Sequence, residues 1–166
     1  MDFEDSPEEA AFRAEVRSWL DANAKPKVKR EASDPMDERS DPEAMKKAKA
    51  WQKTRADKGY ARITWPKGMG GIGGTPMQSI IYGQEESKYD VPTGAAFAIG
   101  LGMCIPTVMA YCGDEVKQRD VKPAVEGTEI WCQLVSVPSG GSDVAALKTR
   151  AVKEGDTWTI NGCKIL

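Results

Sequence analysis

The apolar periodicity of this sequence changes after Gly127. Before that residue, apolar side chains recur at helical spacing; after it, the runs are short and rich in residues that favour strands. Three strand-like runs follow, Thr128–Val137, Lys148–Lys153 and Thr157–Ile160, and a Glu-Gly-Asp hairpin turn joins the last two. The pattern predicts an α+β fold in which a helical part precedes antiparallel strands.

The last predicted strand is incomplete. Asn161-Gly162 is the strongest turn signal in the chain, and a strand returning after it needs about 5 residues. Only four residues follow, up to Leu166. A sheet that stops within a strand exposes unpaired backbone groups and apolar side chains. We therefore expect this chain to be a fragment or to need a partner.

Two helix starts are predicted in the first part of the chain. Ser6–Glu9 has a capping hydroxyl, a proline in the first turn and a glutamate that completes a capping box. Asp41–Glu43 begins a second helix that ends near Gly59, and Lys25–Asp41 is predicted to be a surface loop. Each helix has an apolar face, formed by Phe12, Val16, Trp19 and Leu20 in the first and by Met45, Ala48 and Trp51 in the second.

The composition excludes several classes of function. The 166 residues include no histidine, which removes Ser-His and Cys-His nucleophile pairs and every His-ligated metal. The net charge is −2 and no basic run contains aromatic residues, so we expect neither a metal nor a nucleic-acid partner.

The cysteines and the N-terminus indicate a cellular compartment. No C-x-x-C pair occurs, and we expect buried thiols in a reducing compartment at Cys104, Cys112, Cys132 and Cys163. The first residues are acidic where a signal peptide is basic, so export is not expected. A cytoplasmic location is predicted.

Two sequence features resemble functional motifs without the context that these motifs need. Gly68–Gly73 reads G-x-G-x-x-G, but Pro66 interrupts the approach and the next helix begins later, at Thr75-Pro76, so a glycine-rich surface loop is predicted. Glu85 and Glu86 could form a catalytic carboxylate pair. Adjacent helical residues point about 100° apart, which favours a solvated face or a cap partner instead.

Residues 91–113 carry no charge, which raises the question of a membrane span. Prolines and glycines within the stretch and acidic flanks argue against one, so a buried helix and turn is predicted and no span is expected. Asp114-Glu115 is then predicted to cap a short helix that stops before Pro123.

Between Trp131 and Arg150, a strand-like run leads into a turn of small residues, 139–142. A backbone without bulky side chains can approach a ligand closely, and its N–H groups can point at an anion or a ring carbonyl. The alternative interpretation is a tight turn between strands with no ligand.

Three motifs in this region occur in the same order as in one known family. They are Gln133–Asp143 (QLVSVPSGGSD), Leu147–Ala151 (LKTRA) and Gly155–Lys164 (GDTWTINGCK). Together they resemble the flavin-contacting segment of the acyl-CoA dehydrogenases. Trp65-Pro66 with its following glycines and Ile99–Thr107 are also similar to segments of that family, so the resemblance covers nearly the whole chain.

The resemblance implies a domain order and an activity. Residues 1–127 correspond to the family's helical N-terminal domain and residues 128–166 to an incomplete β-barrel domain, and the C-terminal helical domain is absent. The implied reaction is α,β-dehydrogenation of an acyl-CoA thioester with hydride transfer to FAD, and electron-transfer flavoprotein is the implied acceptor. A homo-oligomer is expected, located in the mitochondrial matrix if the source is eukaryotic.

The resemblance also implies site residues. Gln133 corresponds to a contact at the flavin edge, and Val135 and Ser136 to contacts near the flavin N5 and O4. Gly141 and Ser142 are further cofactor contacts, and Ser142 is also a substrate contact. The glutamate that removes the α-proton belongs to the absent C-terminal domain, so no catalytic residue is expected in this chain.

Some residues depart from the family pattern. Val137 replaces a glutamate, Ser139 begins the G-A-G stretch, and Leu166 stands where a tryptophan flanks the flavin. Two other functions therefore remain open: a non-catalytic interaction or regulatory fragment of the same fold, and an isolated nucleotide-binding module built on the glycine loop. The acyl-chain length of a substrate does not follow from the sequence.

Overall fold

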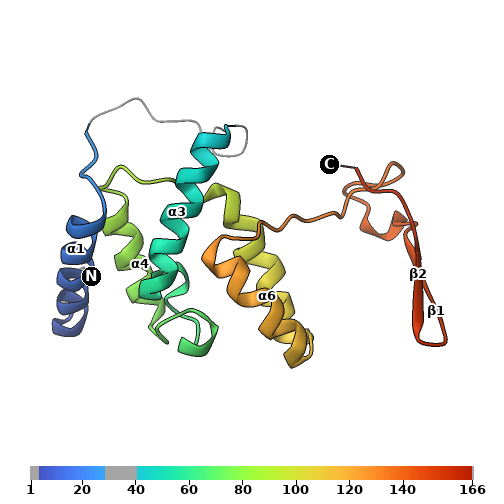
Figure 1. The fold of residues 1–166 in the computed structure, drawn as a ribbon, viewed down its shortest axis with the longest axis horizontal. Helices are drawn as coiled ribbons and strands as arrows, with labels where there is room; N and C mark the ends of the chain where they lie inside the picture. The colour runs from blue at the N-terminus through green and yellow to red at the C-terminus, as the bar shows by residue number, and fades with distance from the viewer. Residues whose placement is uncertain (1–3, 29–40, 166) are drawn as a thin grey trace. The chain divides into compact units, whose positions relative to one another are not determined.

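The computed structural model describes residues 4–28 and 41–165, and the predicted loop over 25–41 lies mostly outside these ranges. The chain divides into two compact units, Met1–Trp131 and Cys132–Leu166 (Figure 1). The first unit is helical and the second contains a two-stranded antiparallel sheet, which confirms the predicted α+β class.

The first unit contains five α-helices in its described part and several shorter helical turns. The α-helices are α1 (Pro7–Asn23), α3 (Pro42–Lys58), α4 (Pro76–Glu86), α5 (Ile105–Tyr111) and α6 (Asp114–Glu126). The short helices are η1 (Tyr60–Arg62), η2 (Lys67–Met69), η3 (Ala95–Phe97) and the π-helix η4 (Gly100–Cys104).

The predicted helix starts are confirmed at three positions. Ser6 caps α1 and Thr75 caps α4, each within a complete capping box, and the Asp41 side chain accepts from the Glu43 backbone N–H at the start of α3. Gly59 ends α3 with a φ of 82°, a left-handed conformation that a side chain would strain.

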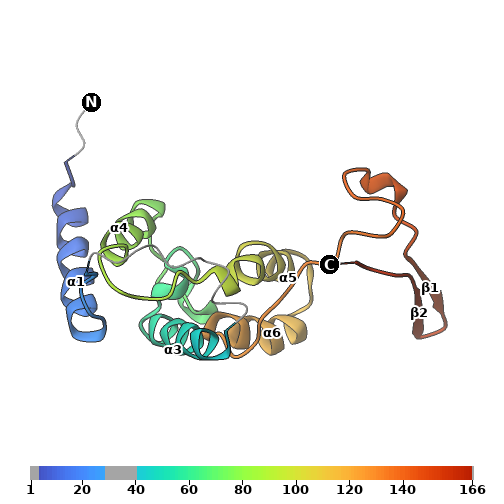
Figure 2. The same cartoon turned by 90° about the horizontal axis from the view of Figure 1, so that it is seen from above.

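Two apolar clusters hold the helices together. α1 packs against α4, and α3 packs against α6 (Figure 2). The core between α1, α3 and α4 is aromatic. The rings of Trp19 and Tyr60 are in edge-to-face contact, with their centroids 5.1 Å apart. The second cluster joins α3, α5 and α6 around Ile105 and Val125, which are buried.

Helix α6 differs from the prediction at both ends. It does not stop before Pro123 but continues through it to Glu126, and Gly127 then adopts a left-handed φ of 75°. Proline interrupts a helix by removing an N–H donor, and here it removes a single bond in the last turn. At the other end Gly113 is the N-cap, and Asp114 and Glu115 lie in the first turn rather than capping it.

The charge-free stretch folds into three short helical pieces, η3, η4 and α5, rather than the predicted buried helix and turn. Phe97, Leu101 and Ile105 are buried, whereas Met103 and Tyr111 are exposed. A π-helix is a break in regular α-helical bonding, and the two glycines of η4 permit it. Among the described residues, no helix combines the length and the apolar character that a membrane span requires.

The second unit contains η5 (Val144–Ala146) and a hairpin of β1 (Arg150–Glu154) and β2 (Thr157–Asn161). The predicted hairpin is present, but its turn is only the two residues Gly155-Asp156, because Glu154 pairs with Thr157 as the last residue of β1. Gly155 has a φ of 61°, which suits such a tight turn.

Two other strand predictions are wrong. Residues 128–136 form no strand in the described structure, and neither do the residues that follow Asn161. A strand needs a neighbour that satisfies its backbone groups, and both segments lack a continuous one here. The prediction of buried thiols is also wrong: Cys132 and Cys163 are exposed, and Cys104 and Cys112 are half-buried.

Candidate functional site

A tight turn lies at the centre of the predicted ligand-contacting segment. The Val137 N–H donates to the Gly140 carbonyl at 3.2 Å, and the Gly140 N–H donates back to the Val137 carbonyl at 3.1 Å. A side chain at position 140 would meet the Ala146 Cβ and the Asp143 carbonyl, both 3.0 Å from an ideal Cβ. The small residues thus form a tight turn. A tight turn here does not exclude the other interpretation, in which the backbone of this segment approaches a ligand.

The segment before the turn lies beside the end of the chain. The Lys164 Nζ donates to the Val135 carbonyl at 3.3 Å, and the Ile165 N–H donates to the Ser136 carbonyl at 3.1 Å. Both carbonyls are therefore occupied by protein donors. At Val135 and Ser136, the backbone N–H groups and the side chains therefore remain for a ligand.

The turn brings the predicted site residues onto its two arms. Val135 and Ser136 precede it, and Gly141 and Ser142 follow it, so Ser136 and Gly141 flank the Val137–Gly140 bridge. Gln133, Ser136, Gly141 and Ser142 are exposed, and Val135 is half-buried. An ideal Cβ at Gly141 would meet no atom within 4 Å, so its backbone is open to close approach.

A hollow of about 300 Å³ adjoins this turn. Its walls come from the turn, the end of β2 and the residues before β1, namely Val137, Pro138, Ser139, Lys148, Thr149, Gly162 and Cys163. The Thr149 Oγ1 is buried and has no hydrogen-bond partner in the described structure. Buried hydroxyls normally have a partner, so this atom is a free hydrogen-bonding group at the site.

Thr149 and Gly162 were not among the predicted site residues. An ideal Cβ at Gly162 would lie 2.5 Å from the Thr149 Oγ1, so glycine is required where the chain leaves the hairpin. The sequence did contain a signal for both, since Thr149 belongs to the LKTRA motif and Gly162 to the Asn-Gly turn.

These groups fit a flavin. A flavin ring presents carbonyl oxygens and ring nitrogens, and the exposed hydroxyls of Ser136 and Ser142 can donate to such acceptors. In the described part of the chain, neither hydroxyl has a protein partner. The unpartnered Thr149 hydroxyl adds a third group that can donate.

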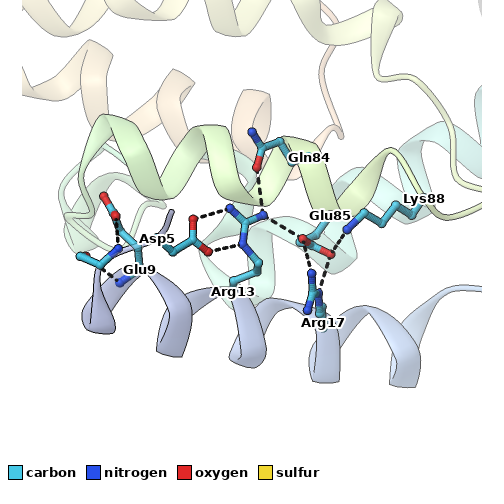
Figure 3. Close-up of polar contacts among 8 residues, drawn as sticks. Asp5, Glu9, Arg13, Arg17, Gln84, Glu85 and Lys88 are labelled. Carbon is cyan, nitrogen blue, oxygen red and sulfur yellow. Dashed lines mark hydrogen bonds and ion pairs between the residues drawn. The ribbon is translucent and has the colours of Figure 1, made fainter. Parts of the chain in front are cut away.

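The prediction that Glu85 lies on a solvated face or partners a cap is wrong. Its side chain is only 1 % exposed and binds three cations (Figure 3), namely Arg13 and Arg17 of α1, each at 2.8 Å, and Lys88 at 2.7 Å. Burial raises the pKa of this carboxyl, but the hydrogen bonds from Arg17, Lys88 and Arg13 outweigh it and lower the pKa to about 2.

Glu86 is also engaged by neighbouring side chains. It accepts from the Trp51 Nε1 at 2.8 Å and from the Tyr82 hydroxyl at 2.9 Å, and Arg55 lies 3.2 Å away. A general base needs a free lone pair near the proton that it removes. Glu85 and Glu86 therefore join α1, α3 and α4 and do not form a catalytic pair.

The glycine loop has the predicted non-nucleotide geometry. Residues Lys67–Met69 form a 3₁₀ turn, no strand precedes it in the described structure, and α4 begins only at Pro76. An ideal Cβ at Gly71 would lie 2.1 Å from the Trp65 carbonyl, so this glycine packs against protein backbone. No group of three or more potential metal ligands occurs among the described residues.

Comparison of the chain with known protein families identifies the class to which it belongs. The family model for "Acyl-CoA dehydrogenase, N-terminal domain" matches residues 6–128. This match spans well over half of the chain, so the chain belongs to the acyl-CoA dehydrogenase family, as the sequence motifs predict.

Similar curated proteins support this assignment. The chain is 33% identical over 157 residues to acyl-CoA dehydrogenase IpdE1 of Mycobacterium tuberculosis, covering 93% of this chain and 40% of that protein. It is 31% identical over 165 residues to a short-chain specific acyl-CoA dehydrogenase of Clostridium acetobutylicum, covering 99% of this chain and 41% of that protein. The chain thus spans about two fifths of the length of these relatives.

Solved structures share the fold. The ChsE4-ChsE5 complex of Mycobacterium tuberculosis aligns with a TM-score of 0.66 at 25% identity, covering 98% of this chain and 39% of that one. Butyryl-CoA dehydrogenase from Megasphaera elsdenii aligns with a TM-score of 0.61 at 23% identity, covering 99% of this chain and 42% of that one.

Proposed function

We propose that this chain is the N-terminal portion of a flavin-dependent acyl-CoA dehydrogenase, an oxidoreductase that removes hydrogen from the α and β carbons of an acyl-CoA thioester. The observation that carries the proposal is the pair of exposed, unpartnered hydroxyls on the two arms of the Val137–Gly140 turn, beside an open glycine backbone. Residues 1–127 are its helical domain, 128–166 the beginning of its β-barrel domain, and a C-terminal helical domain completes the enzyme.

Each site residue has a proposed role in binding FAD. Gln133 would contact the edge of the flavin ring, and the Val135 backbone and the Ser136 hydroxyl would provide further contacts to the ring. Gly141 permits the backbone to approach closely because it has no side chain. Lys164 and the backbone N–H of Ile165 hold the Val135–Ser136 segment in place through its carbonyls.

FAD, when bound, supplies the acceptor for the hydride that leaves the β carbon. The Ser136 hydroxyl would donate a hydrogen bond at the ring edge, where an oriented donor stabilises negative charge without reorganisation. The Ser142 hydroxyl would contact both the cofactor and the acyl-CoA thioester.

The base that removes the α-proton is proposed to come from outside this chain. In the second unit the acids Asp143, Glu154 and Asp156 are exposed, and the buried Glu85 of the first unit is occupied by three cations. A base must lie within hydrogen-bond reach of the proton that it removes, and its pKa must suit the task. A glutamate of the C-terminal helical domain is the proposed source.

The proposed partners follow from the same assignment. Electron-transfer flavoprotein is the proposed electron acceptor. A solved structure of the electron transferring flavoprotein of Acidaminococcus fermentans includes a chain that is 25% identical to this one. The similar ChsE4-ChsE5 structure is a complex of two differently named proteins. For this protein we propose a homo-oligomer in the cytoplasm, or in the mitochondrial matrix in a eukaryote.

A flavin titration tests the proposal. A version of the chain extended with the remaining three fifths of a relative such as IpdE1 is purified, and FAD binding is followed by absorbance and by quenching of flavin fluorescence. We expect stoichiometric binding of FAD to the extended protein and weaker binding to a Ser136→Ala, Ser142→Ala variant. Ser87→Ala, at the C-cap of α4, is the control that removes a hydroxyl elsewhere. Absence of flavin from the extended protein would favour the non-catalytic interaction fragment instead.

A further inference from the structure

A second hollow lies within the helical unit, and none of its lining residues belongs to the proposed flavin site. Its volume is about 510 Å³, within the range of about 300–1,000 Å³ that is typical of small-molecule sites. It is formed by the end of α3, the glycine loop and α6. Its walls include Ala56, Met69, Val121 and Val125, and its rim includes Lys67, Lys117 and Lys122.

The floor of this hollow is apolar and fixed. Val121 and Val125 of α6 are 3 % and 2 % exposed, and Met69 packs against the same core cluster. Gly70 holds the loop against α6, because an ideal Cβ there would lie 2.9 Å from the Val125 Cγ1 and its φ is 86°. A floor built from core residues keeps its shape, so an apolar ligand would not have to order it on binding.

The rim of the hollow is basic, and its charges are weakly paired. In the described part of the chain, Lys67 has no acidic partner. The Lys117 Nζ lies 3.9 Å from Asp114, whose side chain is 91% exposed. The only acid among the lining residues is Glu126, which lies 3.8 Å from Lys53 and 3.9 Å from Lys122. Each of these pairs is long and has one partner that is largely open to solvent, so it contributes little and leaves the ammonium group able to bind an added anion.

We propose that this hollow binds an aliphatic anion, a free fatty carboxylate, with its chain on the Met69, Val121 and Val125 floor and its carboxylate between Lys67 and Lys117. The apolar floor alone would accept any aliphatic chain. The lysines select a negative head group. An ammonium group donates charge-assisted hydrogen bonds to a carboxylate, and these are stronger than the hydrogen bonds that it donates to a neutral alcohol. The proposal does not rest on the proposed dehydrogenase function, because it uses only residues of the helical unit.

Calorimetric titration of the full 166-residue chain with decanoate and with decanol tests this proposal. We expect saturable binding of decanoate at one site and weaker binding of decanol, with the preference for decanoate decreasing as salt is added. Replacing both rim lysines (Lys67→Gln, Lys117→Gln) should weaken decanoate binding by about tenfold or less, since each exposed charge pair contributes modestly, and should leave decanol binding unchanged.

A matched variant separates the site from general charge. Lys46→Gln, Lys47→Gln removes two exposed lysines of α3 that do not line the hollow, and we expect it to bind decanoate as the parent chain does. Gly68→Trp adds bulk at the rim without strain, because an ideal Cβ there meets no atom within 4 Å, and should block both ligands. Circular dichroism checks that each variant is folded.

Three results would overturn the proposal. One is the absence of saturable decanoate binding by the folded chain. Another is an equal loss of decanoate binding in the rim variant (Lys67→Gln, Lys117→Gln) and in the control variant (Lys46→Gln, Lys47→Gln), which would show a nonspecific charge effect. The third is binding to vesicles that contain phosphatidylglycerol without binding to free decanoate, which would make the basic rim a membrane contact.

Discussion

The carboxylate of Glu85 is the strongest electrostatic link between α1 and α4, and its removal should destabilise the helical unit. Glu85→Gln keeps the shape of the side chain but removes the charge that binds Arg13, Arg17 and Lys88 (Figure 3). Because the carboxylate is only 1 % exposed, water replaces little of what is lost. Arg17 and Lys88 are 53% and 55% exposed and can turn to solvent, which limits the cost.

The magnitude follows from the pKa of Glu85. Folding lowers this pKa from its ordinary value of 4.5 to about 2, despite the opposing effect of burial. A difference of this size corresponds to about 3 kcal/mol of stabilisation at neutral pH. Since the glutamine oxygen can still accept one hydrogen bond, we expect Glu85→Gln to lower the free energy of unfolding by about 2–3 kcal/mol at pH 7.

The effect should depend on pH in a defined direction. A carboxylate whose pKa is lowered by folding stabilises the folded state fully above its unfolded pKa, and the stabilisation is lost as the pH falls towards the folded pKa. The difference between the parent chain and Glu85→Gln should therefore be constant from pH 7 to about pH 5 and fall to less than half at about pH 3.

Urea unfolding followed by far-UV circular dichroism measures this difference at each pH. Glu129→Gln serves as the control, because Glu129 is an exposed glutamate outside this cluster, and its effect should stay within about 0.5 kcal/mol. A Glu85→Gln variant as stable as the control at pH 7, or a difference that grows on acidification, would refute the role of the ion cluster.

Three further predictions concern single side chains. Ser6→Ala removes the capping hydroxyl of α1 and should cost about 1 kcal/mol in urea unfolding, whereas an unchanged midpoint would mean that the capping box does not hold this helix. Gly162→Ala places a Cβ 2.5 Å from the Thr149 Oγ1 and should loosen the hairpin, which amide hydrogen exchange over β1 and β2 would detect as faster exchange; unchanged protection would contradict the packing of this turn. In the extended protein, Ser136→Ala should slow flavin reduction by roughly tenfold or more in stopped-flow absorbance, and an unchanged rate would remove Ser136 from the site.

The helical unit could largely be predicted because its signals are local. Ser6, Asp41 and Thr75 cap helices through residues only two or three positions away, and Gly59 ends a helix through its own backbone conformation. Such interactions are visible in a short stretch of sequence. The end of α6 was missed because Pro123 sits close to the helix terminus, where the lost hydrogen bond matters least.

The environment of Glu85 could not be predicted because its partners lie far away in the sequence. Arg13 and Arg17 precede it by 72 and 68 residues, and only the packing of α1 on α4 brings them together. The strand predictions failed for a related reason. The β-propensity of residues 128–136 reflects side chains that suit a sheet. A strand forms only where a neighbouring strand is available to pair with it.

The candidate site was predicted in part. The family motifs identified the segment that holds Ser136 and Ser142, and the turn at Val137–Gly140 agrees with its small residues. Thr149 and Gly162 were missed because their proximity depends on how the chain leaves β2.

Turnover of acyl-CoA by this chain and by its extended version tests the central claim most directly. Both proteins are supplied with FAD, a series of acyl-CoA thioesters of increasing length and an artificial electron acceptor, and reduction of the acceptor is followed by absorbance. The proposed assignment predicts turnover by the extended protein and none by the 166-residue chain, because the base for the α-proton lies outside these residues. Comparable turnover by both proteins would show that a base exists within this chain and would contradict the assignment.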